Sequence, residues 1–309
     1  MAKWINIDQN DGQITHIEDV TFPFGVYRDD YSQMDNHMLP LHWHKYIEYG
    51  LVEEGRVEMR IDSELHLLEP GDCVFINANT LHSGVQRQAA ERAVIRSVDF
   101  TPDLLTAGTR TTVYRRYFDP WYGKAVYGFK IDRDTPSGAV IADLLRKLSD
   151  LDKAEYSYEL NVLSSVSRLW METLCYIGER FPEPSVQTET YSHRKNVMRN
   201  LLIYIQENYA RAVTVEELAE FAHISHSECY RVFRDYTGDT PIGYLNDYRL
   251  TQAEHLLRTT SMSMVGICQS CGFSGQSYFG ERFKIKYGTS PARFRRNHRG
   301  EEKQDNPDA

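Results

Sequence analysis

The sequence lacks any run of 18 apolar residues, whereas a helix that crosses a membrane needs about 20. The first eight residues, MAKWINID, are too polar for a signal peptide. Cysteine is scarce as well, and five cysteines in 309 residues, an odd number, favour a reducing compartment. We therefore expect a cytoplasmic protein with no membrane partner.

Acidic residues outnumber basic ones overall, but the basic residues are unevenly distributed along the chain. The net charge is −9, yet residues 192–298 hold 14 basic and 10 acidic side chains and so carry +4, whereas residues 1–191 carry −11. A basic segment attached to an acidic one is typical of a sensor joined to a nucleic-acid contact surface. The length of 309 residues gives each of two domains room for its own core.

Residues 213–238 show the start and stop signals of a helix-turn-helix. Thr214 with Glu217, and Ser225 with Glu228, form two capping boxes, each of which starts a helix. The apolar spacing in the second helix predicts an inward set made up of Cys229, Val232, Phe233 and Tyr236. The same spacing predicts that the outward residues are polar, basic or aromatic, the kinds that contact base edges and phosphates: His226, Ser227, Tyr230, Arg231 and Arg234.

Residues 263–288 repeat this plan. Gly272-Phe273 is predicted to make the turn and Ser274 to cap the second helix. The side chains expected to face out or partly out are Gln276, Ser277, Glu281, Arg282, Lys284 and Lys286. Cys268 and Cys271 form a C-x-x-C pair, but no second pair of cysteines or histidines lies at ligand spacing. We therefore interpret both cysteines as core residues rather than as a zinc or redox site.

Between the two modules, Thr240 and Pro241 begin a predicted helix of about 18 residues, which would span about 27 Å. That length would let two recognition helices enter successive major grooves, about 34 Å apart. The segments GDTPIGYLNDYRLTQAEHLL and CGFSGQSYFGERFKIKYGTSPARFR closely resemble the DNA-binding domain of the AraC/XylS family of transcription regulators. The resemblance covers about the last third of the chain and implies a double-stranded DNA partner, with bases read by Ser227, Tyr230, Arg231, Gln276 and Ser277.

One position departs from that family's pattern. Where the family usually has a Ser-Arg pair before the Phe-Lys of the second recognition helix, this chain has Gly280-Glu281-Arg282. A carboxylate cannot donate to guanine or contact a phosphate favourably, although it could accept from a cytosine amine. We therefore expect the second module to contribute less affinity than the first or to read a different base.

The first 130 residues follow a different pattern. Short apolar or alternating runs at residues 41–52, 55–61, 73–77 and 93–100, separated by turn residues, predict strands of an antiparallel jelly-roll barrel. The expected fold class is thus α+β, with an N-terminal antiparallel β-barrel followed by an all-α double helix-turn-helix domain.

Four polar side chains within these strands resemble the cupin signature: His42, His44, Glu48 and His82. Alternation would place His42 and His44 on the same side of a single strand, facing the barrel interior, and the barrel topology would bring Glu48 and His82 to them. The resemblance implies a cupin-like effector-binding domain at residues 1–130.

Three uses of this cluster compete. The first is a metal-bound effector pocket, because metal cupins hold iron, manganese or zinc at these four positions. The second, which we favour, is a pocket with no required cofactor, in which the same side chains hydrogen-bond a polar effector. The third is a metal-dependent dioxygenase or isomerase. The resemblance implies a sugar effector, and the aromatic residues available to stack on it, or to serve only as core, are Trp43, Tyr46, Tyr27 and Phe24.

Residues 131–181 contain two helical patterns, at about 137–151 and 157–180, and the second carries an apolar stripe. In relatives such helices mediate dimerisation, so we expect a homodimer. Residues 182–195 are predicted to be the interdomain linker, residues 196–298 the DNA-binding domain and residues 299–309 a disordered tail.

These features together predict a ligand-responsive, sequence-specific transcription regulator of carbohydrate uptake or catabolism genes, and not an enzyme. Its expected partners are operator DNA, a small-molecule effector and RNA polymerase. Two other classes make different predictions. A metal-dependent cupin enzyme fused to a DNA-binding module would turn over a small molecule when metal is added. An RNA-binding or architectural protein would show little base discrimination.

Overall fold

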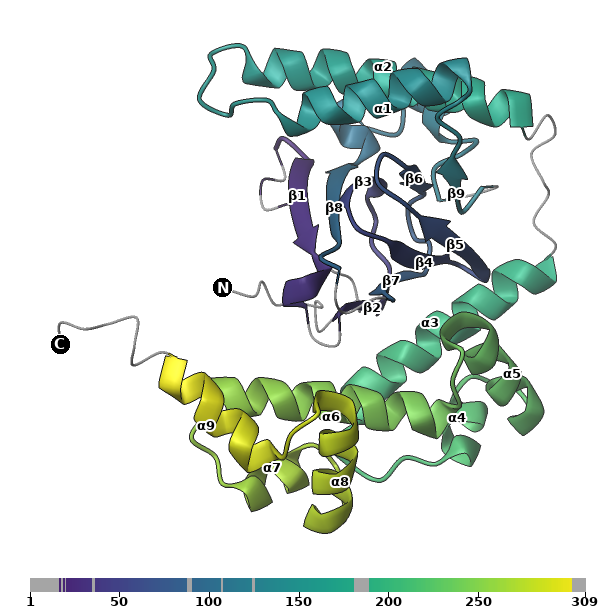
Figure 1. Cartoon of the computed structure of the whole chain (residues 1–309). Coiled ribbons are helices and arrows are strands. Elements are labelled where there is room, and N and C mark those ends of the chain that lie inside the picture. Colours follow the sequence, from purple (N-terminus) through teal and green to yellow (C-terminus); the bar gives the residue numbers. More distant parts are fainter. Residues whose placement is uncertain are drawn as a thin grey trace. The chain divides into compact units, whose positions relative to one another are not determined.

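The computed structural model describes residues 17, 19, 21–34, 37–87, 91–106, 108–123, 126–180 and 189–301. The chain divides into two compact units, Met1–Lys195 and Asn196–Ala309 (Figure 1). None of the helices in the described segments is long and apolar enough to cross a membrane.

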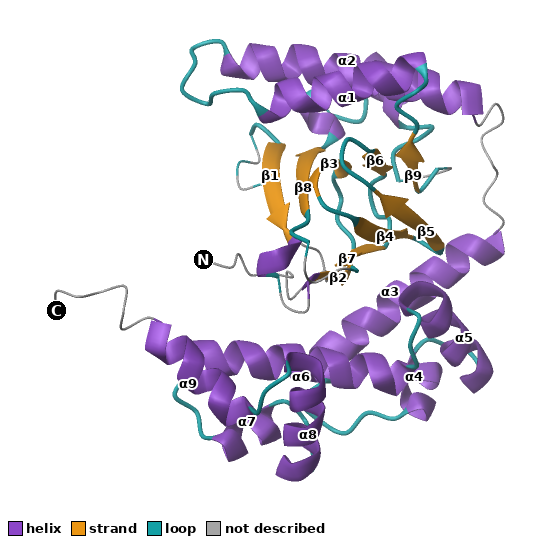
Figure 2. Cartoon of the chain, viewed as in Figure 1, coloured by secondary structure: helices purple, strands orange, loops and turns teal. Residues whose placement is uncertain are grey.

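Two antiparallel sheets form the first unit (Figure 2). The five-stranded sheet has the order β1 (Phe24–Asp30), β8 (Val94–Phe100), β3 (Ile47–Glu54), β6 (Cys73–Ile76) and β9 (Gly128–Ile131). The four-stranded sheet has the order β2 (Met38–His42), β7 (His82–Gln86), β4 (Val57–Ile61) and β5 (Glu64–Leu68). One buried apolar cluster contains residues of both sheets, so the sheets pack face to face. The α+β class is confirmed, although no strand pairing within the described part of the chain closes the two sheets into one barrel.

Two helices cover the outer face of the five-stranded sheet, α1 (Pro136–Ser149) and α2 (Tyr158–Arg180) (Figure 2). Their apolar sides form a second buried cluster with side chains from the outer face of the sheet, such as Tyr49, Phe75 and Phe100. The hydroxyl groups of Tyr49 and Thr173 lie 2.6 Å apart and join β3 to α2. Because the helices cover the outer face of the sheet, its inner face packs against the four-stranded sheet.

The prediction that residues 41–52 form one strand is wrong. The chain leaves the four-stranded sheet after His42 and enters the five-stranded sheet at Ile47. In between, the backbone carbonyl of His44 accepts from the backbone N–H of Asn79, 2.7 Å away, instead of from a neighbouring strand. His42 and Glu48 therefore lie on opposite sheets, and His44 lies in the connection.

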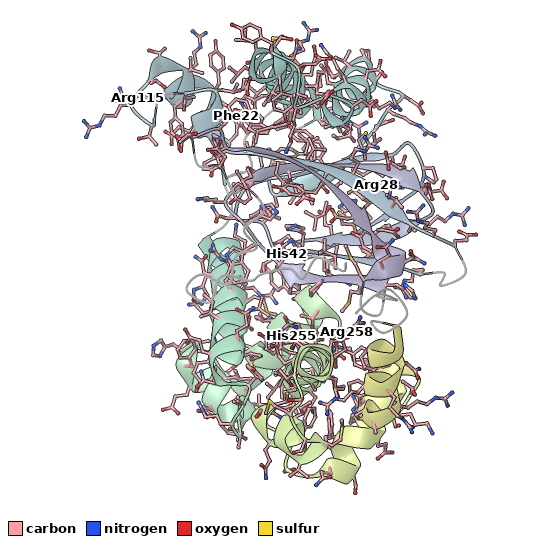
Figure 3. All side chains as sticks on the ribbon, turned by 90° about the vertical axis from the view of Figure 1, so that its left-hand side faces the viewer. Phe22, Arg28, His42, Arg115, His255 and Arg258 are labelled. Carbon is pink, nitrogen blue, oxygen red and sulfur yellow. The ribbon has the colours of Figure 1, made fainter. Side chains whose placement is uncertain are left out.

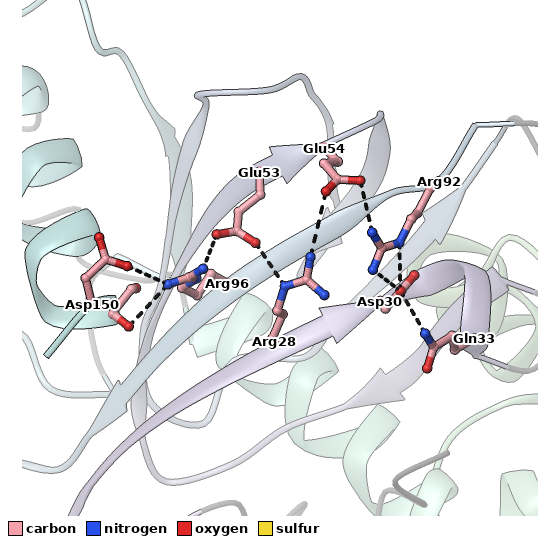
Figure 4. Close-up of polar contacts among 9 residues, drawn as sticks. Arg28, Asp30, Gln33, Glu53, Glu54, Arg92, Arg96 and Asp150 are labelled. Carbon is pink, nitrogen blue, oxygen red and sulfur yellow. Dashed lines mark hydrogen bonds and ion pairs between the residues drawn. The ribbon is translucent and has the colours of Figure 1, made fainter. Parts of the chain in front are cut away.

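A network of ion pairs crosses the end of the five-stranded sheet (Figure 4). Its members are Arg28, Asp30, Glu53, Glu54, Arg92, Arg96 and Asp150. Arg96 on β8 bridges Glu53 on β3, 2.5 Å away, and Asp150 after α1, 3.0 Å away. The exposed pairs of this network, such as Arg28 with Glu54, each contribute at most about 1 kcal/mol.

The second unit is helical. Its elements are α3 (Glu189–Asn208), which begins before the unit boundary, α4 (Val215–Phe221), α5 (His226–Thr237), α6 (Pro241–Thr259), α7 (Met264–Ser270), α8 (Gln276–Tyr287) and α9 (Pro291–Glu301). Helix α6 contacts α5 and also α7, α8 and α9. The buried Arg249 on α6 donates to the carbonyl oxygens of Tyr209, at 2.8 Å, and Arg211, at 2.6 Å. These two bonds fix α6 to the connection between α3 and α4.

Two predicted boundaries need correction. Residues 189–195 of the predicted linker are helical, because α3 begins at Glu189, and residues 299–301 of the predicted tail continue α9. Residues 182–188 of the linker and 302–309 of the tail lie outside the described residues.

Candidate functional site

The first helix-turn-helix consists of α4 and α5, and the predicted caps are present. The Thr214 and Ser225 hydroxyls accept from the backbone N–H of Glu217 and Glu228, both at 3.2 Å. His223 adopts a φ of 54° in the turn between the helices, and Gly238 ends α5 with a φ of 74°. These local signals therefore set the bounds of the two helices as the sequence predicts.

Helix α5 buries one face and exposes the other as predicted. Its buried residues are Cys229, Val232, Phe233 and Tyr236. Its exposed residues include His226, Ser227, Tyr230, Arg231 and Arg234. The Arg231 guanidinium contacts the Glu228 carboxylate, yet the Arg231 side chain is 62% exposed. Because such exposed pairs are weak, DNA can compete with Glu228 for this guanidinium.

The second helix-turn-helix consists of α7 and α8. Gly272 makes the turn with a φ of +73°, and a Cβ there would lie 2.3 Å from the Tyr209 carbonyl oxygen, so glycine is required. The prediction that Ser274 caps the second helix is wrong. Gly275 is the N-cap of α8 and offers no side-chain hydrogen bond.

The outward face of α8 differs in chemistry from that of α5. Gln276, Ser277, Glu281 and Lys284 are exposed, and Arg282 is half-buried. Lys286, which the sequence places facing out or partly out, instead points inward to the Asp247 carboxylate, 2.7 Å away, and to the Asp247 carbonyl, 3.0 Å away. Counted from the two caps, Glu281 occupies the place that Arg231 holds on α5.

The cysteine pair lies in the core. Cys268 and Cys271 are both buried, and burial raises the pKa of the Cys271 thiol to about 12. A thiol with so high a pKa is a poor metal ligand or nucleophile at neutral pH.

The four predicted pocket residues converge between the two sheets. His44 Nε2 lies 2.8 Å from Glu48 Oε2, and His82 Nε2 lies 3.3 Å from the same oxygen. The ring centroid of His42, which ends β2 (Figure 3), lies 4.0 Å from that of His82. All four side chains are buried, and among the described residues the three histidines are the group that could hold a metal ion, with ligand atoms within 4.8 Å of one another.

Backbone carbonyls orient the three imidazoles. The Nδ1 atoms of His42, His44 and His82 lie 2.8, 3.2 and 2.9 Å from the carbonyl oxygens of Pro40, Tyr46 and Thr80. A neutral imidazole has one N–H, and placing it on Nδ1 to donate to the carbonyl leaves an electron pair on Nε2. His44 Nε2 lies at hydrogen-bond distance from Glu48 Oε2, so its proton can instead be on Nε2 and be donated to the carboxylate. With the imidazole protons on Nδ1, the same side chains can bind a cation or a ligand that brings its own protons.

Burial and mutual proximity set the charges of the cluster. Burial, together with the neighbouring His82 and His44, holds the pKa of His42 well below its usual value. Burial also lowers the pKa of His44. Burial alone would raise the pKa of Glu48, but contacts with His44 and His82 hold it well below its usual range. This buried polar cluster, which we call the chamber, therefore presents the neutral imidazoles of His42 and His44 beside an ionised Glu48 carboxylate.

Three further polar residues that the sequence did not single out lie beside this cluster. Ser97 Oγ lies 3.1 Å from Asp29 Oδ2 and 3.4 Å from Glu48 Oε1. Asp99 on β8 is directly opposite Glu48 on β3 and is only 2% exposed. The sequence did contain a signal that could have identified Asp99: it is an acidic residue in the otherwise apolar end of a predicted strand, Val98-Asp99-Phe100.

The predicted aromatic residues take different places. Trp43 is completely buried, as is expected of a core side chain. Tyr27 on β1 is half-buried, and its hydroxyl would lie 2.3 Å from a Cβ at Gly25, so its ring lies over the glycine that faces Asp99. Tyr27 therefore borders the part of the chamber next to Asp99.

Comparison with known proteins agrees with this two-part architecture. Residues 23–161 match an AraC-like ligand binding domain, and residues 218–297 match a helix-turn-helix domain. An uncharacterised HTH-type transcriptional regulator, YdeC of Bacillus subtilis strain 168, is 26% identical over 293 residues, covering 94% of this chain and 97% of YdeC. The HTH-type transcriptional activator RhaS of Mannheimia succiniciproducens is 24% identical over 271 residues, covering 84% of this chain and 90% of RhaS.

Among solved structures, the DNA-binding domain of the global transcriptional factor AdpA in complex with a target DNA is 31% identical, with a TM-score of 0.33. The match covers 34% of this chain and 94% of the AdpA domain.

The fold and the domain matches define a DNA-binding transcription regulator with a ligand-binding domain, a class of regulators and not of enzymes. The chain belongs to the AraC family of transcription regulators.

Proposed function

We propose that this regulator acts in the cytoplasm as a homodimer and controls genes for carbohydrate uptake or catabolism in response to a small polar effector. One observation carries the proposal: a buried cluster of three histidines and a glutamate lies inside the ligand-binding domain of a chain that also exposes one face of α5 and of α8. RNA polymerase is a further proposed partner. An effector switches such a protein only if its affinity differs between the DNA-binding and non-binding states.

The base-reading surface proposed for DNA consists of the outward residues of α5 and α8: His226, Ser227, Tyr230, Arg231, Arg234, Gln276, Ser277, Glu281, Arg282 and Lys284. The support is that most of these residues are exposed while the opposite face of each helix is buried. Exposed Arg and Gln side chains on a helix are suited to reading base edges in the major groove.

The effector contacts proposed within the chamber are His42, His44, Glu48 and His82, with Tyr27 at its border. The support for these contacts is that the four polar side chains, from both sheets and from the connection between them, meet in the buried interior. Hydroxyl groups can donate to the imidazole nitrogens and to the carboxylate, which is why we propose a sugar or sugar derivative.

A divalent metal at the same cluster is a second candidate, and the donor set favours it. Three Nε2 atoms and one carboxylate fit iron, manganese or zinc, and carbonyls that hold Nδ1–H are the usual outer partners of metal-binding imidazoles. Such an ion would offer coordination positions to the oxygen atoms of the effector.

The homodimer is proposed to form through α2. This helix exposes Leu160, at 71%, and Met171, at 45%, although its opposite side is buried. Light scattering should give twice the chain mass of 35.9 kDa, and Leu160→Glu should reduce it to one chain. A monomeric wild-type protein would contradict this part of the proposal.

The double substitution His42→Ala/His44→Ala tests the chamber. We expect the full-length variant to lose its transcriptional response to candidate sugars in a reporter assay, because its main polar contacts are gone. Protein purified without a polyhistidine tag should carry about one equivalent of metal if the metal candidate is correct, and the variant should carry none.

His66→Ala is the matched control, because His66 lies on β5 outside the cluster. It should keep the wild-type response. A double variant that loses thermal stability but binds its sugar with wild-type affinity in calorimetry would show that the histidines are only structural.

A further inference from the structure

Asp99 is a buried carboxyl group with an unmet acceptor. It is 2% exposed, and its Oδ1 atom has no hydrogen-bond partner among the described residues. Its cross-strand neighbours are Glu48 on β3 and Gly25 on β1, so one side offers a second acidic group and the other a glycine over which the Tyr27 ring lies. A buried acceptor without a partner costs free energy, which a protein retains where a ligand completes it.

Acidic side chains gather around Asp99. Asp29, Glu48 and Asp99 are three carboxyl groups, and the Ser97 hydroxyl, which lies near two of them, has a single proton. The surroundings of Asp99 also disfavour a negative charge on this group. Burial first, and then the charges of Glu48 and Asp29, raise its pKa well above the usual range. A ligand that brought a negative charge would meet repulsion from the ionised Glu48 carboxylate.

We propose that Asp99, with Asp29 and Ser97, forms a second arm of the effector chamber that selects a polyol rich in hydrogen-bond donors and rejects anionic compounds. The inference rests on the proposed function, because it takes the chamber as the effector site, and it narrows the effector to neutral or amino-substituted polyols. Sugar acids and sugar phosphates are excluded by charge, since leaving a buried carboxylate beside an anion is strongly unfavourable.

The first test measures stability without an effector. In Asp99→Asn the amide supplies a donor to the surrounding carboxyl groups, so its melting temperature should rise by about 2 to 4 °C. Asp30→Asn is the control, because Asp30 is also buried but already binds Arg92 at 2.8 Å, and its melting temperature should fall. All four tryptophans lie within the first 195 residues, so their fluorescence reports this unit. A lower melting temperature for Asp99→Asn would overturn the proposal.

The second test measures selectivity. Full-length protein is dialysed against an equimolar mixture of neutral monosaccharides and alditols, amino sugars, sugar acids and sugar phosphates, and the retained compounds are identified by mass spectrometry. We expect retention of neutral or amino compounds, reduced at least tenfold in Asp99→Asn and kept in Asp30→Asn. Retention of amino sugars alone would show that the ligand donates to Asp99 through an ammonium group. Retention of neutral compounds would show that it donates through hydroxyl groups.

Retention of an acid or a phosphate, equal retention by Asp99→Asn, or retention of nothing from the mixture would each overturn the proposal. DNA binding by the same preparations separates this failure from failure of the proposed function. A protein that binds a specific operator but retains an acid contradicts only the acidic arm, whereas a protein without specific DNA binding contradicts the regulator itself.

Discussion

Side-chain identity made the chamber predictable only in part. The His-x-His pair, Glu48 and His82 were recognisable because imidazoles and a carboxylate at this spacing are rare in apolar strands, and the structure brings them together. Asp99 and Ser97 could not be placed beside them from the sequence, because that proximity depends on the register between β3 and β8. Strand register is a tertiary property that a single strand does not encode.

The two recognition helices also differ at single residues. The exposed Arg231 on α5 has Glu281 as its counterpart on α8. An acidic side chain that faces the duplex repels phosphates and releases no counterion.

Glu281→Arg should therefore tighten binding to operator DNA and steepen the dependence of log K on log salt by about 1. Fluorescence anisotropy over a range of salt concentrations measures both quantities. Glu179→Arg, which makes the same change in net charge on the exposed part of α2 in the other unit, should leave both nearly unchanged. If Glu281→Arg behaved like this control, position 281 would not face DNA.

At the scale of elements, helices were easier to predict than strands. The predicted caps at Thr214, Ser225 and Thr240 lie at helix starts because capping is a local interaction. The break between β2 and β3 was missed, although Lys45 interrupts the alternation of residues 41–52 at the point where the chain changes sheets. The cap of α8 was misplaced by one residue, from Ser274 to Gly275.

That uncapped start of α8 gives an element-scale prediction. Gly275 has extended backbone, and an added Cβ would meet nothing within 4 Å, so Gly275→Ser should stabilise the second unit by a few tenths of a kcal/mol. Ser225→Ala on the first module should destabilise it by about 1 kcal/mol, because the N–H of Glu228 loses its acceptor. Thermal unfolding of the two variants and the wild type, followed by the circular dichroism signal of the helices, measures both changes in stability. Changes of the same sign would show that capping does not control these helix starts.

At the scale of the whole molecule, the sequence predicted two functional parts and their order because charge and periodicity both change along the chain. Helix α6, with 19 residues, spans about 28 Å and contacts both helix-turn-helix modules. This length is close to the repeat of the DNA major groove, about 34 Å, so one chain can present two reading helices to one face of a duplex. The identity of the effector could not be predicted, because it depends on the shape of a chamber built from both sheets.

Hydroxyl-radical footprinting of the full-length protein on a genomic site selected by binding tests the central claim most directly. For each chain we predict two protected patches on one face of the duplex, separated by about 10 bp. Arg231→Ala should remove the protection of one patch and cost about 1 to 3 kcal/mol on the selected site, but little on random DNA. A single patch per chain, or equal weakening on selected and random DNA, would contradict a regulator that reads its operator through two helices.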